Sequence, residues 1–133
     1  MNEFQFHGRL RRLNDYRETI SEIWRLGTQY RADMEPYRGH TPEQFWQILK
    51  ALPFQDDPKG IETVSRPGFT MRPDWAGPRD CDDKATAAVG YFAMKGLLNH
   101  VRLLVVGELD FPHHIYPEVY RGGEWLSFDA TYP

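Results

Sequence analysis

Hydrophobic residues recur every three or four positions through residues 9–35, with Arg, Glu and Asp between them. This period is that of one face of an α-helix. The pattern therefore predicts an amphipathic helix over residues 9–35, weakened at Gly27 and ended by Pro36. The hydrophobic face expected to meet the core consists of Leu13, Tyr16, Ile20, Ile23 and Tyr30.

A second helix is predicted from Thr41 to about Leu52. Thr41 is a good N-cap, Pro42 suits the first helical position, and Gln44 completes a capping box with Thr41. Pro53 follows the last apolar position, so the helix should end just before it.

Prolines and glycines interrupt residues 53–78 so often that no long element fits there. A short strand over residues 61–64 is the regular element that we expect within it. An irregular segment of this length is uncommon in a compact domain and is often functional.

A third helix is predicted directly after Asp80, which is a candidate N-cap. Asp82 and Asp83 suit the positive end of the helix dipole, and apolar side chains then recur at helical spacing. This helix should end near Gly96 or Asn99.

The remaining residues are rich in β-branched and aromatic side chains, which favour strands. Strands are predicted over residues 101–109, 114–120 and 124–130, and the RGG sequence at 121–123 is a hairpin turn signal. Helices followed by strands indicate an α+β fold. A chain of 133 residues suits one domain, with a helical part at 1–55, an irregular approach segment at 56–80, and a helix plus three strands at 81–133.

Charge and composition exclude several classes of protein. The net charge is -3 and no basic stripe is interleaved with aromatics, which argues against a nucleic-acid partner. No apolar run reaches the roughly 20 residues of a membrane span, and the N-terminus lacks the apolar region of a signal peptide. The sequence therefore predicts a cytoplasmic protein without a membrane partner, and no His/Cys cluster has metal-ligand spacing that would indicate a metal or cofactor.

Cys81 is the only cysteine, and it stands among carboxylates ahead of an apolar run. A lone cysteine is usually a small core residue. A thiolate, however, is stabilised at a helix N-terminus, where the free amides could also face a developing oxyanion. Asp82 and Asp83 oppose the thiolate, so we expect them to point away from the sulfur or to pair with Lys84 or an arginine.

A base and an orienting group for this thiol could come from the last hairpin. On a strand, His114 shares a face with Tyr116, while Ile115 lies on the other. A turn at 121–123 would bring Asp129 near the start of the strand that carries His114, within hydrogen-bond reach. Asp129 could instead cap its strand through an Asx-turn.

Two neighbouring residues complicate this strand. His113 could compete with His114 for the role of base, although alternation would put the two on opposite faces. Pro117 lacks an N–H donor, which predicts an edge strand or a bulge.

The stretch RDCDDKATAAVGYFAMKGL (79–97) resembles the Cys-Asp-Asp-Lys-Ala segment of transglutaminase-like cysteine enzymes. The stretch HHIYPEVYRGGEWLSFDATYP (113–133) is similar to the His-bearing strand, turn and Asp-x-Thr strand of the same family. The resemblance covers about residues 60–133 and implies a papain-like core. It implies Cys81 as nucleophile, His114 as general base and Asp129 as the orienting carboxylate.

The resemblance also implies acyl transfer from an amide of a protein or peptide substrate, with hydrolysis favoured over transfer to an amine. Small members of the family often occur in bacteria and phages. The family's second oxyanion donor is an upstream side chain, for which Trp46, Gln55 and Trp75 are the candidates here. The residues expected to wall or support the site are Trp75, Asp80, Tyr116 and Trp125.

Two alternatives stay open. The chain could be a non-catalytic structural or interaction module that keeps the fold with an idle triad, for instance in phage assembly. Arylamine acetylation uses the same triad, but the Cys-Asp-Asp-Lys context and the short length disfavour it. Asp82 and Asp83 are expected to be N-terminal helix charges rather than metal ligands.

Overall fold

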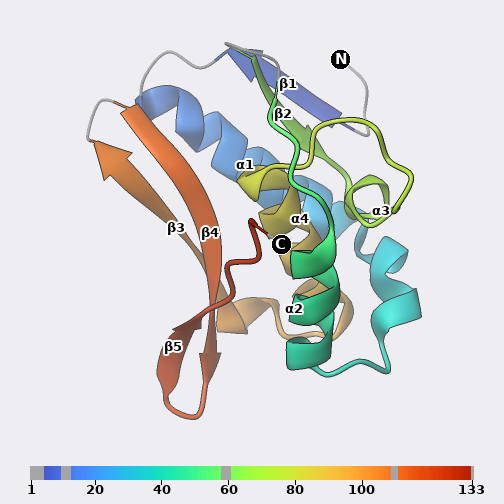
Figure 1. The fold of residues 1–133 in the computed structure, drawn as a ribbon. Coiled ribbons are helices and arrows are strands. Elements are labelled where there is room, and N and C mark those ends of the chain that lie inside the picture. The colour runs from blue at the N-terminus through green and yellow to red at the C-terminus, as the bar shows by residue number, and fades with distance from the viewer. Residues whose placement is uncertain (1–4, 10–12, 58–60, 109–110, 133) are drawn as a thin grey trace.

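Helix α4 (Cys81–Met94) lies at the centre of the fold, and the other elements surround it (Figure 1). The computed structural model describes residues 5–9, 13–57, 61–108 and 111–132. The arrangement is α+β, as predicted, with helices around α4 on one side and an antiparallel sheet on the other. The remaining elements, in chain order, are β1 (Gln5–Arg9), α1 (Leu13–Gln29), η1 (Arg31–Tyr37), α2 (Pro42–Ala51), β2 (Ile61–Ser65), α3 (Pro67–Thr70), η2 (Leu98–His100), β3 (Val101–Glu108), β4 (Phe111–Arg121) and β5 (Glu124–Ser127).

The N-terminus of α4 begins where its capping residues predict. The Asp80 carboxylate accepts hydrogen bonds from the amides of Asp82 (3.1 Å) and Asp83 (3.4 Å), and the Asp83 carboxylate accepts one from the Asp80 amide (3.1 Å). This capping box satisfies amides that have no partner inside the helix. The helix is buried from Asp82 through Phe92, so α4 is the central core element.

Helix α1 is shorter than the predicted range of 9–35. It ends at Gln29, and the chain continues as the 3-10 helix η1, which contains Pro36. Pro36 cannot donate an α-helical hydrogen bond, and the Asp33 carboxylate is held by the Arg66 guanidinium at 2.7 and 2.9 Å. This long-range ion pair orients η1 away from the axis of α1.

Gly27 has a role in packing rather than in ending the helix. It lies inside α1, where a Cβ would be 2.6 Å from Val89 Cγ1 of α4. Glycine at this position therefore lets α1 approach the central helix closely.

Helix α2 confirms the predicted bounds and its capping box at Thr41 and Gln44. Its buried face carries Phe45, whose ring stacks on Tyr91 of α4 with centroids 4.2 Å apart. An ion pair between Glu43 and Arg121 connects the start of α2 to the last hairpin.

The three predicted C-terminal strands form one sheet in the order β3-β4-β5. The β4–β5 turn is made by Gly122 and Gly123, whose φ angles of 60° and 85° suit glycine. Strand β5 ends at Ser127 rather than at residue 130, because the chain then leaves the sheet. A second sheet pairs the predicted β2 with β1, a strand that lies where the sequence pattern indicated no element before the first helix.

Pro117 lies in the central strand β4, so the expectation of an edge strand is wrong. Its carbonyl accepts a hydrogen bond from the Phe128 amide at 2.8 Å, on the side of β4 that β5 no longer covers. In an antiparallel pair a residue presents its N–H and C=O to the same neighbour. Pro117 therefore lacks its N–H on the side facing β5, just beyond the last β4–β5 pair, so no ladder hydrogen bond is lost.

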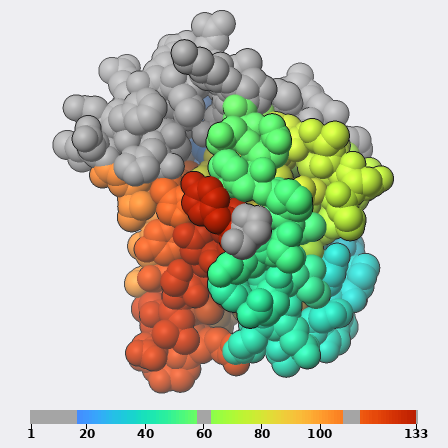
Figure 2. Space-filling model, in the orientation of Figure 1, coloured from blue at the N-terminus to red at the C-terminus, as the bar shows by residue number. Residues whose placement is uncertain are grey.

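Residues 128–132 cross from the sheet to α2. In Figure 2 these red C-terminal residues lie between the orange strands and the green helix. The Tyr132 ring packs against Phe54, just beyond α2, with centroids 4.9 Å apart. Among the described residues, no helix combines the length and apolar character that crossing a membrane requires.

Candidate active site

Cys81 is the first residue of α4 and is partly exposed. The N-terminus of a helix is the positive end of the helix dipole, which favours a negative charge at this position. Helix α4 packs against β4, the strand that carries His114. The helix that begins with Cys81 and the strand that carries His114 are therefore in direct contact.

The carboxylates that follow Cys81 behave differently from one another. Asp83 points away from the sulfur, since its oxygens accept hydrogen bonds from the amides of Ser65 (2.9 Å) and Asp80 (3.1 Å). Asp82 does not, because its Oδ1 lies 3.5 Å from Cys81 Sγ. A carboxylate in this position favours the protonated thiol over the thiolate. Of the two aspartates expected to point away from the sulfur or to pair with a cation, Asp83 points away, whereas Asp82 contacts the sulfur.

Arg79 organises the irregular segment that leads to Cys81. Its guanidinium is buried and donates to the carbonyls of Pro53 (3.3 Å), Thr70 (2.9 Å) and Arg72 (2.5 Å). Its main chain also exchanges two hydrogen bonds with Gln55, at 2.8 and 2.9 Å. These contacts fix the backbone two residues before the nucleophile, a role that the sequence pattern did not reveal.

His114 and Asp129 are brought together, as predicted, although Asp129 reaches His114 from beyond the end of β5 rather than from within the hairpin. His114 Nε2 lies 2.7 Å from Asp129 Oδ2, and the two side chains are 23% and 31% exposed. With a carboxylate at Nε2, this nitrogen carries the proton and Nδ1 is left with its lone pair. The pair therefore fixes the tautomer that a general base for a thiol requires.

The two carboxylate oxygens of Asp129 have separate partners. Oδ2 faces His114, while Oδ1 accepts hydrogen bonds from the Thr131 amide (3.1 Å) and hydroxyl. The alternative Asx-turn thus exists alongside the contact with His114. Burial by itself would raise the pKa of Asp129, but the hydrogen bonds from Thr131 and His114 outweigh it and hold the pKa below its ordinary value.

A β-bulge lies at the functional end of β4. Val106 pairs with His114, but the next residue, Gly107, pairs with Pro112, so the register shifts beside the histidine. Bulges of this kind redirect side chains near sites. The expected orientation of the His113 side chain lies outside the described part of the chain.

The residues expected to wall the site are distributed unevenly. The Tyr116 ring stacks on His114 with centroids 5.4 Å apart, which places it beside the pair. Trp125 contacts Tyr120 instead, at 5.3 Å. Tyr120 is six residues along β4 from His114, or about 20 Å at strand spacing, so Trp125 is too distant to wall the site.

Asp80 caps α4 rather than forming a wall, and Trp75 covers the loop before it. The Trp75 indole donates to the Pro78 carbonyl at 3.0 Å. A Cβ at Gly77 would be 2.3 Å from the Trp75 ring, so glycine is required for this contact. Trp75 therefore shapes the loop that enters α4.

The structure separates the three candidates for a second oxyanion donor. The indole N–H of Trp46 is bound to the Asp129 carbonyl at 2.9 Å, and that of Trp75 is bound to Pro78. Gln55 has an exposed side chain that lines a hollow of about 340 Å³ beside Gly77 and Pro78. The two indole N–H groups are therefore engaged with carbonyls, and Gln55 is the remaining candidate.

Three carboxylates meet close to the start of α4. Asp57, Asp80 and Asp82 each offer an oxygen within 4.8 Å of the others, and they are the described residues that could hold a metal ion. Burial, the charges of Asp83 and Asp82, and a hydrogen bond with Asp57 raise the pKa of Asp80 well above its ordinary value. A proton on Asp80 gives a partner to Asp57 Oδ1, which is buried and has none otherwise among the described side chains. Burial and the neighbouring carboxylates therefore favour the protonated form of Asp80 in this cluster.

We expect Asp80→Asn to be more stable than the parent protein at neutral pH. A carboxyl whose pKa is raised by folding stabilises the protein below its unfolded pKa, and this contribution is lost as pH rises through the folded pKa. Asparagine is a good N-cap and carries no charge, so the gain should be about 1 kcal/mol at pH 7. Urea unfolding at several pH values measures it, and the difference should vanish near pH 3. Asp56→Asn, at an exposed position, is the control, and a destabilised Asp80→Asn at pH 7 would contradict the assignment.

Comparison with protein-family models, with curated proteins and with solved structures found no match for this chain.

Proposed function

We propose that this protein is a thiol-dependent acyl-transfer enzyme of transglutaminase-like, papain-like architecture, acting on an amide of a protein or peptide. The observation that carries the proposal is the hydrogen bond of 2.7 Å between His114 and Asp129. It holds an imidazole in the base tautomer on a strand that packs against the helix of Cys81. A histidine and carboxylate paired in this way, with a thiol at a helix N-terminus, are the components of cysteine-based acyl transfer.

In the first half of the reaction, His114 Nδ1 takes the proton of the Cys81 thiol. The sulfur then bonds to the carbonyl carbon of the substrate amide, and the carbonyl oxygen becomes an oxyanion. When this intermediate collapses, the carbon–nitrogen bond breaks and the departing ammonia or amine takes the proton from His114. Asp129 stabilises the imidazolium while it carries that proton.

The oxyanion needs donors at the place where negative charge develops. We assign the first to the main-chain amide of Cys81, because N–H groups in the first turn of a helix point toward its N-terminal end, where the helix dipole favours negative charge. We assign the second to the Gln55 carboxamide, because the main chain of Gln55 is bound to Arg79, two residues before the nucleophile. The indole N–H groups of the two tryptophan candidates donate to the carbonyls of Asp129 and Pro78 instead.

In the second half of the reaction, His114 removes a proton from water or from an amine, which attacks the thioester carbonyl carbon. The carbon–sulfur bond then breaks, and the departing Cys81 sulfur takes the proton back from His114. Water yields an acid, so the enzyme is a protease or amidase, whereas a lysine amine yields a crosslink. We favour hydrolysis, because the bacterial members of the family that the sequence resembles include many hydrolases. A non-catalytic module is the alternative, and the Asp82 carboxylate beside Cys81 Sγ is the contact that favours it.

Thiol reactivity distinguishes an enzyme from an idle fold. Native protein is treated with iodoacetamide at pH 7, and we expect alkylation of Cys81 at least tenfold faster than that of a free cysteine peptide, since a positioned imidazole promotes the thiolate. Native protein is then incubated with peptides containing an internal glutamine, with and without methylamine, and the products are analysed by mass spectrometry. Glutamate or a cleaved peptide indicates hydrolysis, and a methylamide indicates amine transfer.

The control is Cys81→Ser, which keeps the size of the side chain and removes the reactive sulfur. Every product should disappear in this variant. Alkylation of the parent protein only after denaturation, together with the absence of products, would overturn the enzymatic proposal and support the non-catalytic module.

A further inference from the structure

Lys84 is a buried cation within the central helix, one turn beyond Cys81. It is 2% exposed, and it follows two buried aspartates and precedes a run of small and apolar residues on α4. It pairs with neither Asp82 nor Asp83, contrary to one expectation from the sequence. Its ammonium group donates instead to the carbonyls of Leu52 (2.8 Å) and Lys50 (3.5 Å), at the end of α2.

These acceptors suit a cation. The last carbonyls of a helix lack helical partners and carry the negative end of the helix dipole. A hydrogen bond to a charged group is also stronger than one between neutral groups. Lys84 therefore fastens the end of α2 to the helix that carries the nucleophile.

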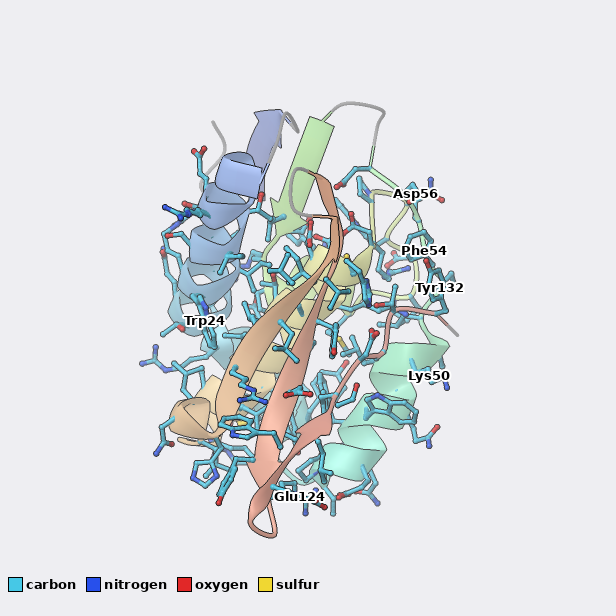
Figure 3. The ribbon with its side chains drawn as sticks, turned by 90° about the vertical axis from the view of Figure 1, so that its left-hand side faces the viewer. Trp24, Lys50, Phe54, Asp56, Glu124 and Tyr132 are labelled. Carbon is cyan, nitrogen blue, oxygen red and sulfur yellow. The ribbon has the colours of Figure 1, made fainter. Side chains whose placement is uncertain are left out.

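Helix α2 in turn holds the segment that contains Asp129. This segment has left the sheet, since β5 ends at Ser127. The Trp46 indole of α2 donates to the Asp129 carbonyl at 2.9 Å, and Tyr132 packs on Phe54 beyond the helix end. Figure 3 shows Tyr132 next to Phe54 and Lys50, on one side of the molecule.

We propose that Lys84 is a positioning residue for the acyl-transfer site, which sets the place of Asp129 relative to Cys81 through α2. The inference rests on the proposed function and names a residue that touches none of the reacting atoms. Lys84 and Cys81 lie about one helical turn apart on α4. The bonds from Lys84 to the end of α2 therefore fix the position of α2 relative to Cys81. Trp46 transmits that position to the main chain of Asp129.

The electrostatics of Lys84 agree with this role. Burial and the charge of Arg79 lower the pKa of Lys84, the charge of Asp129 opposes them, and the net result is a pKa of about 8. A buried cation costs more than an apolar side chain of similar size. The attraction to Asp129 and the two carbonyl contacts offset that cost.

The test compares Lys84→Met with Lys95→Met. Lys95 is a matched control because it also donates to a main-chain carbonyl, that of His40 at 2.8 Å, from the far end of α4. Both variants should lose stability. Lys84→Met alone should slow alkylation of Cys81 by about tenfold, since small displacements of catalytic groups have effects of this size. Proton NMR should also show the downfield signal of the His114 Nε2–H shifted upfield or lost to exchange with water.

Trp46→Phe removes the hydrogen bond from α2 to the Asp129 carbonyl. This variant tests the inference even if Lys84→Met does not fold. It should change the His114 signal in the same direction, and a double variant should show less than additive effects on alkylation. A folded Lys84→Met or Trp46→Phe that leaves both the signal and the alkylation rate at their parent values would overturn the inference. Because the NMR signal needs no activity, an inert Cys81 in the parent protein would count against the proposed function alone.

Discussion

His114→Ala should lower the rate of acyl transfer by about 10²–10⁴-fold, the usual effect of losing a general base. The variant keeps Cys81 at the helix N-terminus but removes the group that takes its proton. Alkylation of Cys81 by iodoacetamide at neutral pH should slow as well. Rate constants for alkylation and for release of ammonia from a glutamine peptide measure the two effects in the same variant.

His113→Ala is the matched control, since it removes a histidine from the adjacent position of β4. The hydrogen bond to Asp129 belongs to His114, so His113→Ala should keep at least about half of the parent rate. Equal losses in the two variants would show that the base has been assigned to the wrong histidine.

Asp129→Asn should keep the fold while reducing acyl transfer by about 10²–10⁴-fold. An asparagine has the shape of the aspartate but can donate to His114 Nε2, which selects the tautomer with the proton on Nδ1. That nitrogen could then no longer accept the thiol proton. The rate of Cys81 alkylation and the downfield NMR signal of His114 should both fall.

The pH dependence of stability gives a second measurement on this variant. The pKa of Asp129 is held below its ordinary value, so its contribution is present above the unfolded pKa and is lost as pH falls through the folded pKa. Asp129→Asn should therefore be less stable than the parent at pH 7, with the difference shrinking in acid. Asp74→Asn, at an exposed position, should show neither effect. Full thiol reactivity in Asp129→Asn would remove Asp129 from the mechanism.

Elements defined by local interactions were predicted correctly. The capping boxes at Thr41 and Asp80 join groups three residues apart, so the sequence contains all of their parts. The turn at Gly122 and Gly123 depends on backbone angles that glycine alone adopts easily. The starts of α2 and α4 and the hairpin of β4 and β5 followed from these signals.

Elements that depend on distant contacts were predicted less well. The end of α1 depends on the ion pair of Asp33 with Arg66, and the end of β5 depends on the capture of the Asp129 carbonyl by Trp46. Strand β1 pairs with β2, and no periodic pattern near residue 5 indicated it. In each case the deciding partner lies more than thirty residues away along the chain.

The candidate site also combines features set by local sequence with features set by distant contacts. The sequence by itself determined Cys81 at the start of a helix and a strand with alternating faces that carries His114, because helix caps and strand alternation are local properties. Only the tertiary structure decided that Asp129 has left the sheet and is held from α2, that Lys84 binds carbonyls of α2, and that Asp82 faces the sulfur. These contacts depend on how α2, α4 and the hairpin pack, and burial leaves polar side chains only the partners that this packing provides.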